Sequence, residues 1–303
     1  MTKVIPFTSS AVSEAARLIL EGQPVAVPTE TVYGLAADAT SAEAVSRIYQ
    51  AKGRPSFNPL IVHVQDMESA HRIAIFGSRL DKLAEQHWPG PLTIVAPLRP
   101  ESGIAALATA GLNTVAVRMP SHPAMRALLQ AVERPLAAPS ANASGSISST
   151  RAEHVLRSLG GRIPLILDGG PCAGGIESTI VAEREGELRL LRAGPIEIPG
   201  ASPVGGGSIE APGQLASHYA PSKPLRLNAI SAEPDEYWIG FGQVDGQSNL
   251  SASGDFVEAA ANLFDFLHRA DLSEEPGIAV APVPEIGLGA AINDRLKRAA
   301  APR

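Results

Sequence analysis

The chain contains 303 residues, of which 45% are hydrophobic, 18% are charged and only 4% are aromatic. This composition supports a folded core and excludes a disordered chain, and the length favours two domains. The net charge of -6 provides no overall cationic field for nucleic acid or an anionic membrane, and so few aromatic residues offer few stacking platforms for nucleobases. The single cysteine, Cys172, excludes an intrachain disulfide and a cysteine-rich zinc site.

The N-terminal residues lack the apolar core of a signal peptide, and no apolar run is long enough to span a membrane. A lone cysteine is also typical of proteins that live in a reducing compartment. We therefore expect a cytoplasmic protein without a membrane segment.

Helical and strand-like patterns alternate through the first two thirds of the chain. Helices are expected from Ser10, from Ser41 to Gly53, and from a capping box formed by Thr150 and Glu153. Strands are expected at residues 24–28, 60–64, 92–98, 114–118 and 165–167, and a hairpin at 178–182 and 188–192. The alternation predicts an α/β sheet covered by helices, and the hairpin makes that sheet mixed rather than purely parallel.

The composition changes between residues 199 and 223, where proline and glycine leave little room for regular structure. We expect a functional linker there. The glycine triplet at 205–207 lacks the strand–helix frame of a phosphate loop and is expected to be a flexible tether. The linker separates a larger domain, 1–198, from a small α/β domain, 224–303. In the small domain, strands are expected at 225–227, 237–241 and 278–280, and helices at 255–269 and 289–300.

Polar side chains gather at residues 28–35, directly after the first buried strand. In open α/β sheets, ligands bind beyond the carboxyl ends of strands. Two hydroxyls, a carboxylate and a phenol at this place therefore suit a small polar ligand. The alternative is a capped turn in which Gly34 takes a positive φ.

A second polar loop, residues 52–59, begins with Lys52 and Arg54, which Gly53 and Pro55 stiffen. Both cations can face one polyphosphate, the arginine as a bidentate fork and the lysine as a point charge. The alternative is a solvated helix C-terminus, where basic residues complement the helix dipole. His63 lies in the next strand, where a satisfied structural histidine is the ordinary outcome.

A third loop, residues 139–150, is rich in hydroxyl groups and leads into the helix expected at Thr150. Donors before a helix N-terminus often hold phosphate, although the Gly-Lys-Ser/Thr ending of a Walker sequence is missing. The alternative is a flexible serine-rich loop. Arg118, at a strand end, suits a carboxylate or else forms a surface ion pair. Cys172 has no activating base nearby in sequence, so it is assigned no nucleophilic role.

Taken in order, four segments of the chain resemble the YrdC family: residues 28–35, 52–54, 139–142 and 177–180. The linker, with its run His218-Tyr219-Ala220-Pro221, and the small domain are similar to the family's two-domain form, the L-threonylcarbamoyladenylate synthases. The resemblance implies a twisted, open mixed α/β sheet around a concave cleft in a catalytic domain at 1–198. It also implies a small Rossmann-like α/β domain at 224–303 and a linker at 199–223 that closes over the cleft.

The same resemblance implies a reaction. L-threonine, bicarbonate or carbon dioxide, and ATP are joined into threonylcarbamoyl-AMP, and pyrophosphate is released. A downstream threonylcarbamoyl transferase complex then passes the group to the adenosine beside the anticodon of tRNA. Two anions meet in this reaction, so catalysis is chiefly positioning and charge neutralisation. Magnesium (Mg2+) is the expected cofactor, held mainly by phosphate and water, and no protein ligand is assigned to it.

Site residues follow from the resemblance, position by position. Those that match the family's catalytic motifs are Lys52, Arg54, Ser140 and Asn142. Those expected on the ATP side are Arg54, Asn58, Thr114, Ser140, Ser148, Arg192 and Tyr219. Those expected on the L-threonine side are Thr31, His63, Arg118, Ala138 and Ser178. Among these, Arg118 is the natural partner of the amino-acid carboxylate.

One departure from the family pattern lies in the linker. Residues Gln214-Leu215-Ala216-Ser217 stand where the family normally has a methionine-lysine-tyrosine-like run, so no lysine–phosphate contact is expected from this stretch.

Two other functions remain open. A non-catalytic RNA-binding or ribosome-associated protein is the alternative, disfavoured by the net charge, and a transient contact with tRNA also stays open. Carbamoyl transfer to another acceptor would need extra modules, for which one cysteine and this length leave no room.

Overall fold

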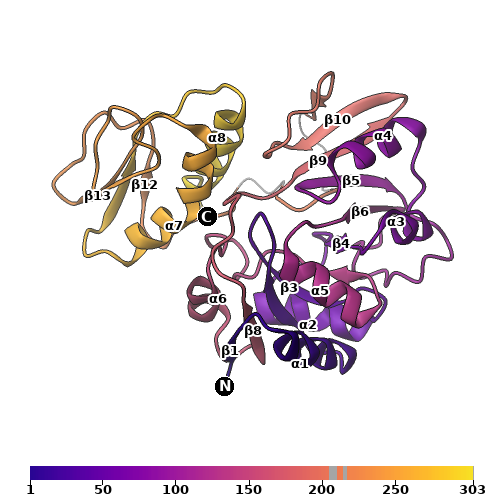
Figure 1. Cartoon of the computed structure of the whole chain (residues 1–303). Helices are drawn as coiled ribbons and strands as arrows, with labels where there is room; N and C mark the ends of the chain where they lie inside the picture. The colour runs from indigo at the N-terminus through magenta and orange to yellow at the C-terminus, as the bar shows by residue number, and fades with distance from the viewer. Residues whose placement is uncertain (205–209, 214–216, 303) are drawn as a thin grey trace.

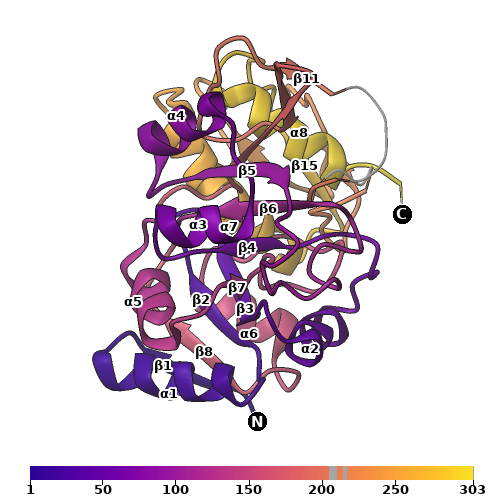
Figure 2. The ribbon, with the colours of Figure 1, turned by 90° about the vertical axis from the view of Figure 1, so that its right-hand side faces the viewer.

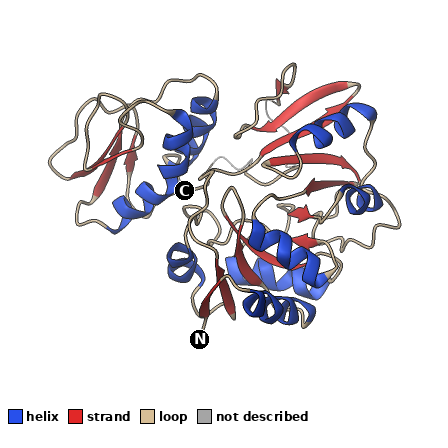
Figure 3. Ribbon diagram, viewed as in Figure 1, coloured by secondary structure: helices blue, strands red, loops and turns tan. Residues whose placement is uncertain are grey.

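The computed structural model describes residues 1–204, 210–213 and 217–302. These residues form two sheets, one from the first two thirds of the chain and one from the last third (Figures 1 and 3). The expected tether at 205–207 and most of the departure at 214–217 lie outside the described residues.

The larger sheet has eleven strands and is mixed. They are β1 (Lys3–Pro6), β2 (Val25–Pro28), β3 (Tyr33–Asp38), β4 (Ile61–His63), β5 (Leu92–Pro97), β6 (Thr114–Arg118), β7 (Leu136–Ala137), β8 (Leu165–Asp168), β9 (Thr179–Arg184), β10 (Glu187–Arg192) and β11 (Ser202–Pro203). Their order is β1-β8-β2-β3-β7-β4-β6-β5-β9-β10-β11. The parallel pair β4–β6 and the antiparallel pairs β2–β3 and β9–β10 confirm the predicted mixed sheet and hairpin. β11 lies in the expected linker and extends the sheet edge.

Helices cover both faces of this sheet. They are α1 (Ser9–Leu20), α2 (Ala42–Lys52), α3 (Met67–Ile73), α4 (Ser78–His87), α5 (Pro123–Val132) and α6 (Ala152–Leu159). Alternate residues of β2 show why both faces are apolar, because Val25 and Val27 pack in one core with α1 and α5, whereas Ala26 belongs to a second core with α2. Figure 2 shows α1 and α5 on one side of β2 and β3 and α2 on the other.

The helix ends expected at Ser41 and Gly53 are confirmed. The Ser41 hydroxyl accepts a hydrogen bond in the first turn of α2, and Gly53 ends the helix with a φ of 60°. The start expected at Ser10 is wrong by two residues. Thr8 caps α1 instead, because its hydroxyl accepts the Ala11 N–H at 3.2 Å and also contacts the Ser10 hydroxyl.

The capping box expected at Thr150 is wrong. α6 follows Arg151 and has no side-chain cap. The Thr150 carbonyl accepts a hydrogen bond from the Cys172 N–H (3.0 Å), and its N–H and hydroxyl face the His154 ring. The groups of Thr150 are therefore directed to the His154 ring and to Cys172 instead of to a capping box with Glu153.

The turn within residues 28–35 is shorter than expected, because β3 begins at Tyr33 and pairs antiparallel with β2. Gly34 therefore lies in an extended strand, and the alternative of a positive-φ turn is wrong. A Cβ at position 34 would lie 3.3 Å from the Ala138 Cβ, so glycine allows the close approach of the neighbouring segment.

The smaller sheet has four parallel strands in the order β12-β15-β13-β14. They are β12 (Leu225–Arg226), β13 (Glu236–Gly240), β14 (Ser248–Asn249) and β15 (Gly277–Val280), and the helices α7 (Phe256–Leu272) and α8 (Leu288–Ala299) accompany them. Both helices lie on the side of the small sheet that faces the larger body (Figure 1). Ile239, Phe264 and Ile292 share one core, which confirms the predicted small α/β unit.

Candidate active site

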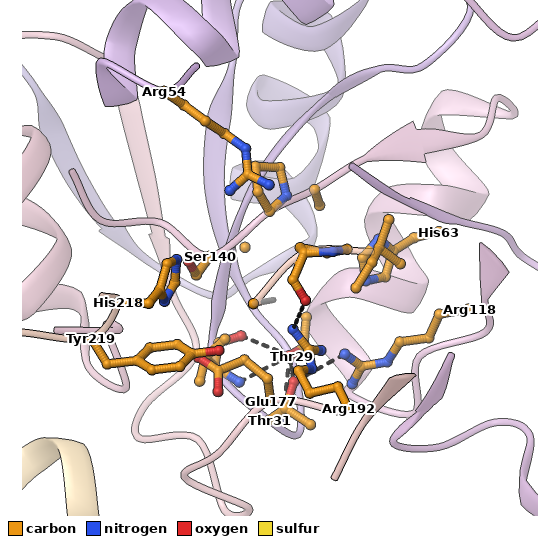
Figure 4. Close-up of a pocket in the computed structure, with 17 residues that line it drawn as sticks. Thr29, Thr31, Arg54, His63, Arg118, Ser140, Glu177, Arg192, His218 and Tyr219 are labelled. Atoms are coloured by element: carbon orange, nitrogen blue, oxygen red, sulfur yellow. Dashed lines mark hydrogen bonds between the residues drawn. The ribbon is translucent and has the colours of Figure 1, made fainter. Parts of the chain in front are cut away.

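A pocket lies where several loops at the edge of the larger sheet meet the linker (Figure 4). Its walls come from the β2–β3 turn, the segment after α2, strands β4, β6 and β10, the loop after β7, the β8–β9 loop and the linker. The lining residues are Thr29, Thr31, Val32, Gly34, Arg54, Ile61, His63, Arg118, Ala138, Pro139, Ser140, Glu177, Arg192, Pro212, Gly213, His218 and Tyr219. Arg54, Arg118 and Arg192 enter from different sides, so the pocket is suited to anions.

Arg54 is a buried cation held by backbone carbonyls. Its Nε donates to the Asn58 oxygen (3.3 Å) and its Nη2 to the Pro59 oxygen (3.0 Å). Burial lowers the pKa of Arg54 to about 10, so the guanidinium stays charged at neutral pH. The carboxamide oxygen of Asn58 is also buried and has no hydrogen-bond partner among the described residues. This corner therefore offers an oriented charge and an unused polar atom.

Lys52 lies behind the pocket wall. Its ammonium donates to the backbone oxygens of Ser140 and Asn142, both at 2.5 Å, and the side chain is buried. Burial, and then the charge of Arg54, hold the pKa of Lys52 well below its usual value. The alternative of a solvated helix end is wrong. In this structure the lysine fixes the loop that carries Ser140.

Arg118 is buried in an ion pair, so the alternative of a surface pair is wrong. Its Nη2 donates to the Glu30 carboxylate at 2.5 Å, and its Nη1 donates to the Thr31 hydroxyl at 3.0 Å. Burial would raise the pKa of Glu30, but the charge of Arg118 and the hydrogen bonds from Arg118 and Ser121 lower it on balance. The guanidinium is therefore held in one orientation beside the pocket.

His63 points into the pocket as a neutral ring (Figure 4). Burial, and then the charge of Arg118, lower the pKa of His63 to about 3. Its Nδ1 is buried and has no hydrogen-bond partner among the described residues, which argues against the alternative of a satisfied structural histidine. A buried polar atom without a partner beside a cavity is a candidate ligand contact.

The loop at residues 139–150 is fixed by tertiary hydrogen bonds. Besides the two bonds from Lys52, the Ala143 N–H donates to the Ser158 hydroxyl (2.8 Å). The Ser148 hydroxyl donates to the Glu177 carboxylate at 2.5 Å. These bonds argue against the alternative of a flexible serine-rich loop and place Glu177, which sequence reasoning did not assign, on the pocket wall.

Arg192 and Ser178 form a second buried pair. The Arg192 Nε donates to the Ser178 oxygen (3.0 Å) and its Nη2 to the Ser178 hydroxyl (3.1 Å). That hydroxyl lies 2.7 Å from the Thr93 hydroxyl. The Arg192 Nη1 donates to the Pro212 oxygen at 3.1 Å, so the linker docks directly on this arginine.

His218 and Tyr219 bring the linker into the pocket. Both are buried, and the Tyr219 hydroxyl and the His218 Nδ1 have no hydrogen-bond partner among the described residues. The next N–H, of Ala220, donates to the Gly145 oxygen at 2.8 Å and joins the linker to the third loop. Sequence reasoning quoted His218 in a motif but gave it no role; its unused ring nitrogen marks it as a further candidate.

Two family models match the chain. A model of the Sua5/YciO/YrdC group, described as "Telomere recombination", matches residues 17–194, and one described as "Threonylcarbamoyl-AMP synthase, C-terminal domain" matches residues 189–301. The chain belongs to the Sua5/YciO/YrdC family. The resemblance expected from the four motif segments is therefore confirmed.

Relatives within the Sua5/YciO/YrdC family are similar over nearly the whole chain. The threonylcarbamoyl-AMP synthase of Bacillus subtilis is 39% identical, over 96% of this chain and 93% of its own length. That of Pyrococcus abyssi is also 39% identical, over 94% of this chain and 92% of its own length. The crystal structure of P. abyssi Sua5 complexed with L-threonine superimposes with a TM-score of 0.90 at 35% identity, covering 99% of this chain and 98% of that one.

The structure brings eight of the family-derived site residues to the pocket wall. They are Thr31, Arg54, His63, Arg118, Ala138, Ser140, Arg192 and Tyr219. The other six, which do not line it, are Lys52, Asn58, Thr114, Asn142, Ser148 and Ser178. Of these, Ser148 and Ser178 are one hydrogen bond from the lining residues Glu177 and Arg192, whereas Thr114 begins β6 opposite Pro97. Their direct contacts with a ligand stay predictions.

No three histidine, cysteine, aspartate or glutamate side chains within the described residues come together as ligands for a metal ion. The pocket carboxylate of Glu177 is already shared with Arg295. The expectation that magnesium is held mainly by phosphate and water stays a prediction. Over the same residues, every helix is too short or too polar to cross a membrane. Cys172 is buried, and burial raises the pKa of its thiol to about 12, in keeping with the absence of a predicted nucleophilic role.

Proposed function

We propose that the chain is a threonylcarbamoyl-AMP synthase, a nucleotidyltransferase that joins L-threonine, bicarbonate and ATP and releases pyrophosphate. One observation carries the proposal. Three buried arginines converge on one pocket in a chain that matches synthases of this name over almost its full length. An anion-binding pocket enclosed by a linker suits a reaction between a nucleotide and an amino acid.

The nucleotide side of the proposed site contains Arg54, Arg192 and Tyr219. The two guanidiniums are fixed by backbone oxygens, so they meet a triphosphate without reorganising, and fixed charges of this kind favour the negative charge that develops during phosphoryl transfer. Tyr219 brings an unused hydroxyl from the linker. Ser140, whose carbonyl Lys52 holds, is proposed to contact the nucleotide from the third loop.

The L-threonine side contains Thr31, His63 and Arg118. Arg118 is proposed to bind the amino-acid carboxylate, and its bonds to Glu30 and Thr31 fix its orientation beforehand. His63 is neutral and has an unused Nδ1, so it can hydrogen-bond with the amine. With a pKa of about 3 it is too weak a base to carry a proton at neutral pH, and we assign it a positioning role.

In the proposed reaction, the threonine amine attacks the carbon of CO2, formed from bicarbonate by loss of hydroxide, and gives up a proton to water to become a carbamate. The carbamate oxygen then attacks the α-phosphorus of ATP, and the bond to pyrophosphate breaks. Both reactants are anions, so arginine charges and the exclusion of water by the linker are the main contributions of the protein. Magnesium is proposed to enter with ATP as its counter-ion, coordinated by phosphate oxygens and water.

The product is proposed to feed a downstream threonylcarbamoyl transferase complex that modifies tRNA, in the cytoplasm. The RNA-binding alternative is less well supported. The pocket arginines are buried rather than spread over a surface that a polyanion can reach. The net charge of -6 also disfavours a mainly RNA-binding role.

Pyrophosphate release tests the proposed function. Purified protein supplied with ATP, magnesium, L-threonine and bicarbonate should release pyrophosphate and form threonylcarbamoyl-AMP, which mass spectrometry detects. Omission of L-threonine or of bicarbonate should abolish both signals. Pyrophosphate release at the full rate without threonine would contradict the proposal.

A further inference from the structure

The small C-terminal unit reaches the pocket through one buried side chain. Arg295, on α8, is fully buried and is the largest such side chain among the described residues. Its Nε donates to the Glu177 carboxylate at 3.1 Å, and its Nη1 donates to the Ala193 oxygen at 2.7 Å. Both partners belong to the larger body. A guanidinium that is removed from water needs such partners to offset its desolvation, so this contact is an integral part of the interface between the two units.

Glu177 connects Arg295 to the pocket. One carboxylate oxygen accepts from Arg295 and the other accepts from the Ser148 hydroxyl at 2.5 Å, so the side chain is held from two directions. The carboxylate itself lines the pocket, beside Arg192 and Tyr219. Arg295 also lies over the Tyr219 ring, 5.7 Å from its centroid. One residue of α8 thus contacts two groups of the pocket wall.

The backbone before Glu177 is docked on the same small unit. Gly175 has a φ of 69°, and a Cβ there would lie 2.1 Å from the Ala260 oxygen of α7. Ile176 is fully buried in the core that also contains Phe264. This segment cannot shift without moving against α7 and α8.

We propose that Arg295 is a positioning residue for the nucleotide side of the site, acting through Glu177; this inference rests on the proposed function. Without the guanidinium, a buried carboxylate would remain beside the pocket arginines and would compete with the triphosphate for them. Glu177 and Arg192 line the same pocket, so the freed carboxylate would lie close to this arginine. The small unit is then part of the catalytic apparatus rather than an appended module.

The test compares Arg295→Met, Glu177→Gln and the double variant by steady-state pyrophosphate release. Arg295→Met should raise the KM for ATP about tenfold or more, because the Glu177 carboxylate loses its charge-assisted partner and then competes with the triphosphate, and it should change the KM for L-threonine less. In the double variant, the ATP KM should lie within about threefold of that of Glu177→Gln alone, because the competing carboxylate is gone. A purely structural role predicts instead that the two effects multiply, and that result would overturn the proposal.

Lys297→Met is the matched control, because Lys297 lies on the exposed side of the same helix and pairs with Glu285 on the surface. It should leave both KM values within about twofold of the native ones. If Arg295→Met fails to fold, Arg295→Gln removes the same charge with a polar side chain, whereas Arg295→Lys keeps the charge and should stay near the native ATP KM. A folded Arg295→Met or Arg295→Gln variant with the native ATP KM would refute the role of Arg295.

The two proposals fail in different ways. If the native protein forms no threonylcarbamoyl-AMP, the proposed function is wrong. If the native protein is active and the folded variants that remove the Arg295 charge have its ATP KM, only the positioning role is wrong.

Discussion

The two sides of the pocket are built in different ways. On the threonine side, His63 and Arg118 stand opposite each other on the paired strands β4 and β6, so strand register alone sets their spacing. On the nucleotide side, Arg54 follows α2, Arg192 ends β10 and Tyr219 comes from the linker. One half of the site is therefore fixed by two neighbouring strands, and the other is assembled from distant segments. Substitutions that disturb the interface with the small unit should therefore change the KM for ATP more than the KM for L-threonine.

The largest expected effect is the loss of Arg118. Arg118→Met should lower kcat/KM for L-threonine about a hundredfold, because it removes a charged contact to the amino-acid carboxylate. It also leaves Glu30 buried without its counter-ion, which should cost about 3–5 kcal/mol of stability. Initial rates at varied threonine, with unfolding monitored by circular dichroism, separate the two effects. Arg126→Met, on α5 outside the pocket lining, is the control. An unchanged threonine KM would exclude Arg118 from the amino-acid site.

Loss of Arg54 should affect the other side of the pocket. Arg54→Ala should lower turnover at least about tenfold, mainly through the KM for ATP, since one charge-assisted phosphate contact contributes about 1.5–3 kcal/mol. Initial rates at varied ATP measure this. Arg47→Ala removes an arginine of α2 that pairs with Glu43 at the surface, and it should leave the rates near native. Equal losses for both substrates would contradict the division into two sides.

A glycine pair tests the interface itself. Gly175→Ala should lower the free energy of unfolding by about 2 kcal/mol or more, because it combines a strained positive φ with a clash against the α7 backbone. Gly186→Ala is matched in φ, at 77°, but has open space around it, so only strain of about 1 kcal/mol is expected. Urea unfolding measures both. Of the two, only Gly175→Ala should also raise the ATP KM, and equal effects of the two variants would argue against close docking.

Sequence patterns predicted the parts of the fold that depend on local signals. The cap at Ser41, the end at Gly53, strand β6 and the β9–β10 hairpin all have turn residues or apolar alternation within a few positions. The short strands β7 and β11 were not predicted, because two residues carry no period and their existence depends on pairing with distant strands. The cap predicted at Thr150 is wrong for another reason, because its N–H and hydroxyl face the ring of His154 in α6 and its carbonyl accepts from the distant Cys172.

The site was predictable where the chemistry lies in a contiguous motif and not where docking creates it. Arg54 and Ser140 were found from their motifs, and both line the pocket. Lys52 was found too, but only the structure shows that its ammonium donates hydrogen bonds to carbonyl oxygens of the neighbouring loop. Arg295 was not identified, because in sequence it is an ordinary arginine of an amphipathic helix. Its partner lies 118 residues away, and no local pattern reports that contact.

The smallest expected effect is on the pH dependence of stability. It concerns two buried histidines, one near the threonine side of the pocket and one near the nucleotide side. Burial, and then Arg118, lower the pKa of His63 to about 3, and burial, and then His154, lower the pKa of His268 to about 3 as well. An unfolded histidine titrates near about 6.5. Between pH of about 6.5 and 3 the unfolded chain therefore binds protons that the native chain does not. The free energy of unfolding should therefore decrease as the pH is lowered through this window, with a limiting slope of about 1.4 kcal/mol per pH unit for each histidine.

Urea unfolding of the His63→Gln and His268→Gln variants at pH values of about 7, 6 and 5 measures these slopes. Each variant should flatten the fall in stability, and His71→Gln, at a half-exposed position, is the control. Because His63 lies on the sheet side and His268 contacts the Ser148 carbonyl from α7, the two sites share no hydrogen-bond partner. Their effects should therefore add in the double variant. If the pH slope of the double variant were no smaller than that of either single variant, the two histidines would be coupled through one shared network. That result would contradict the division of the site into two independent sides.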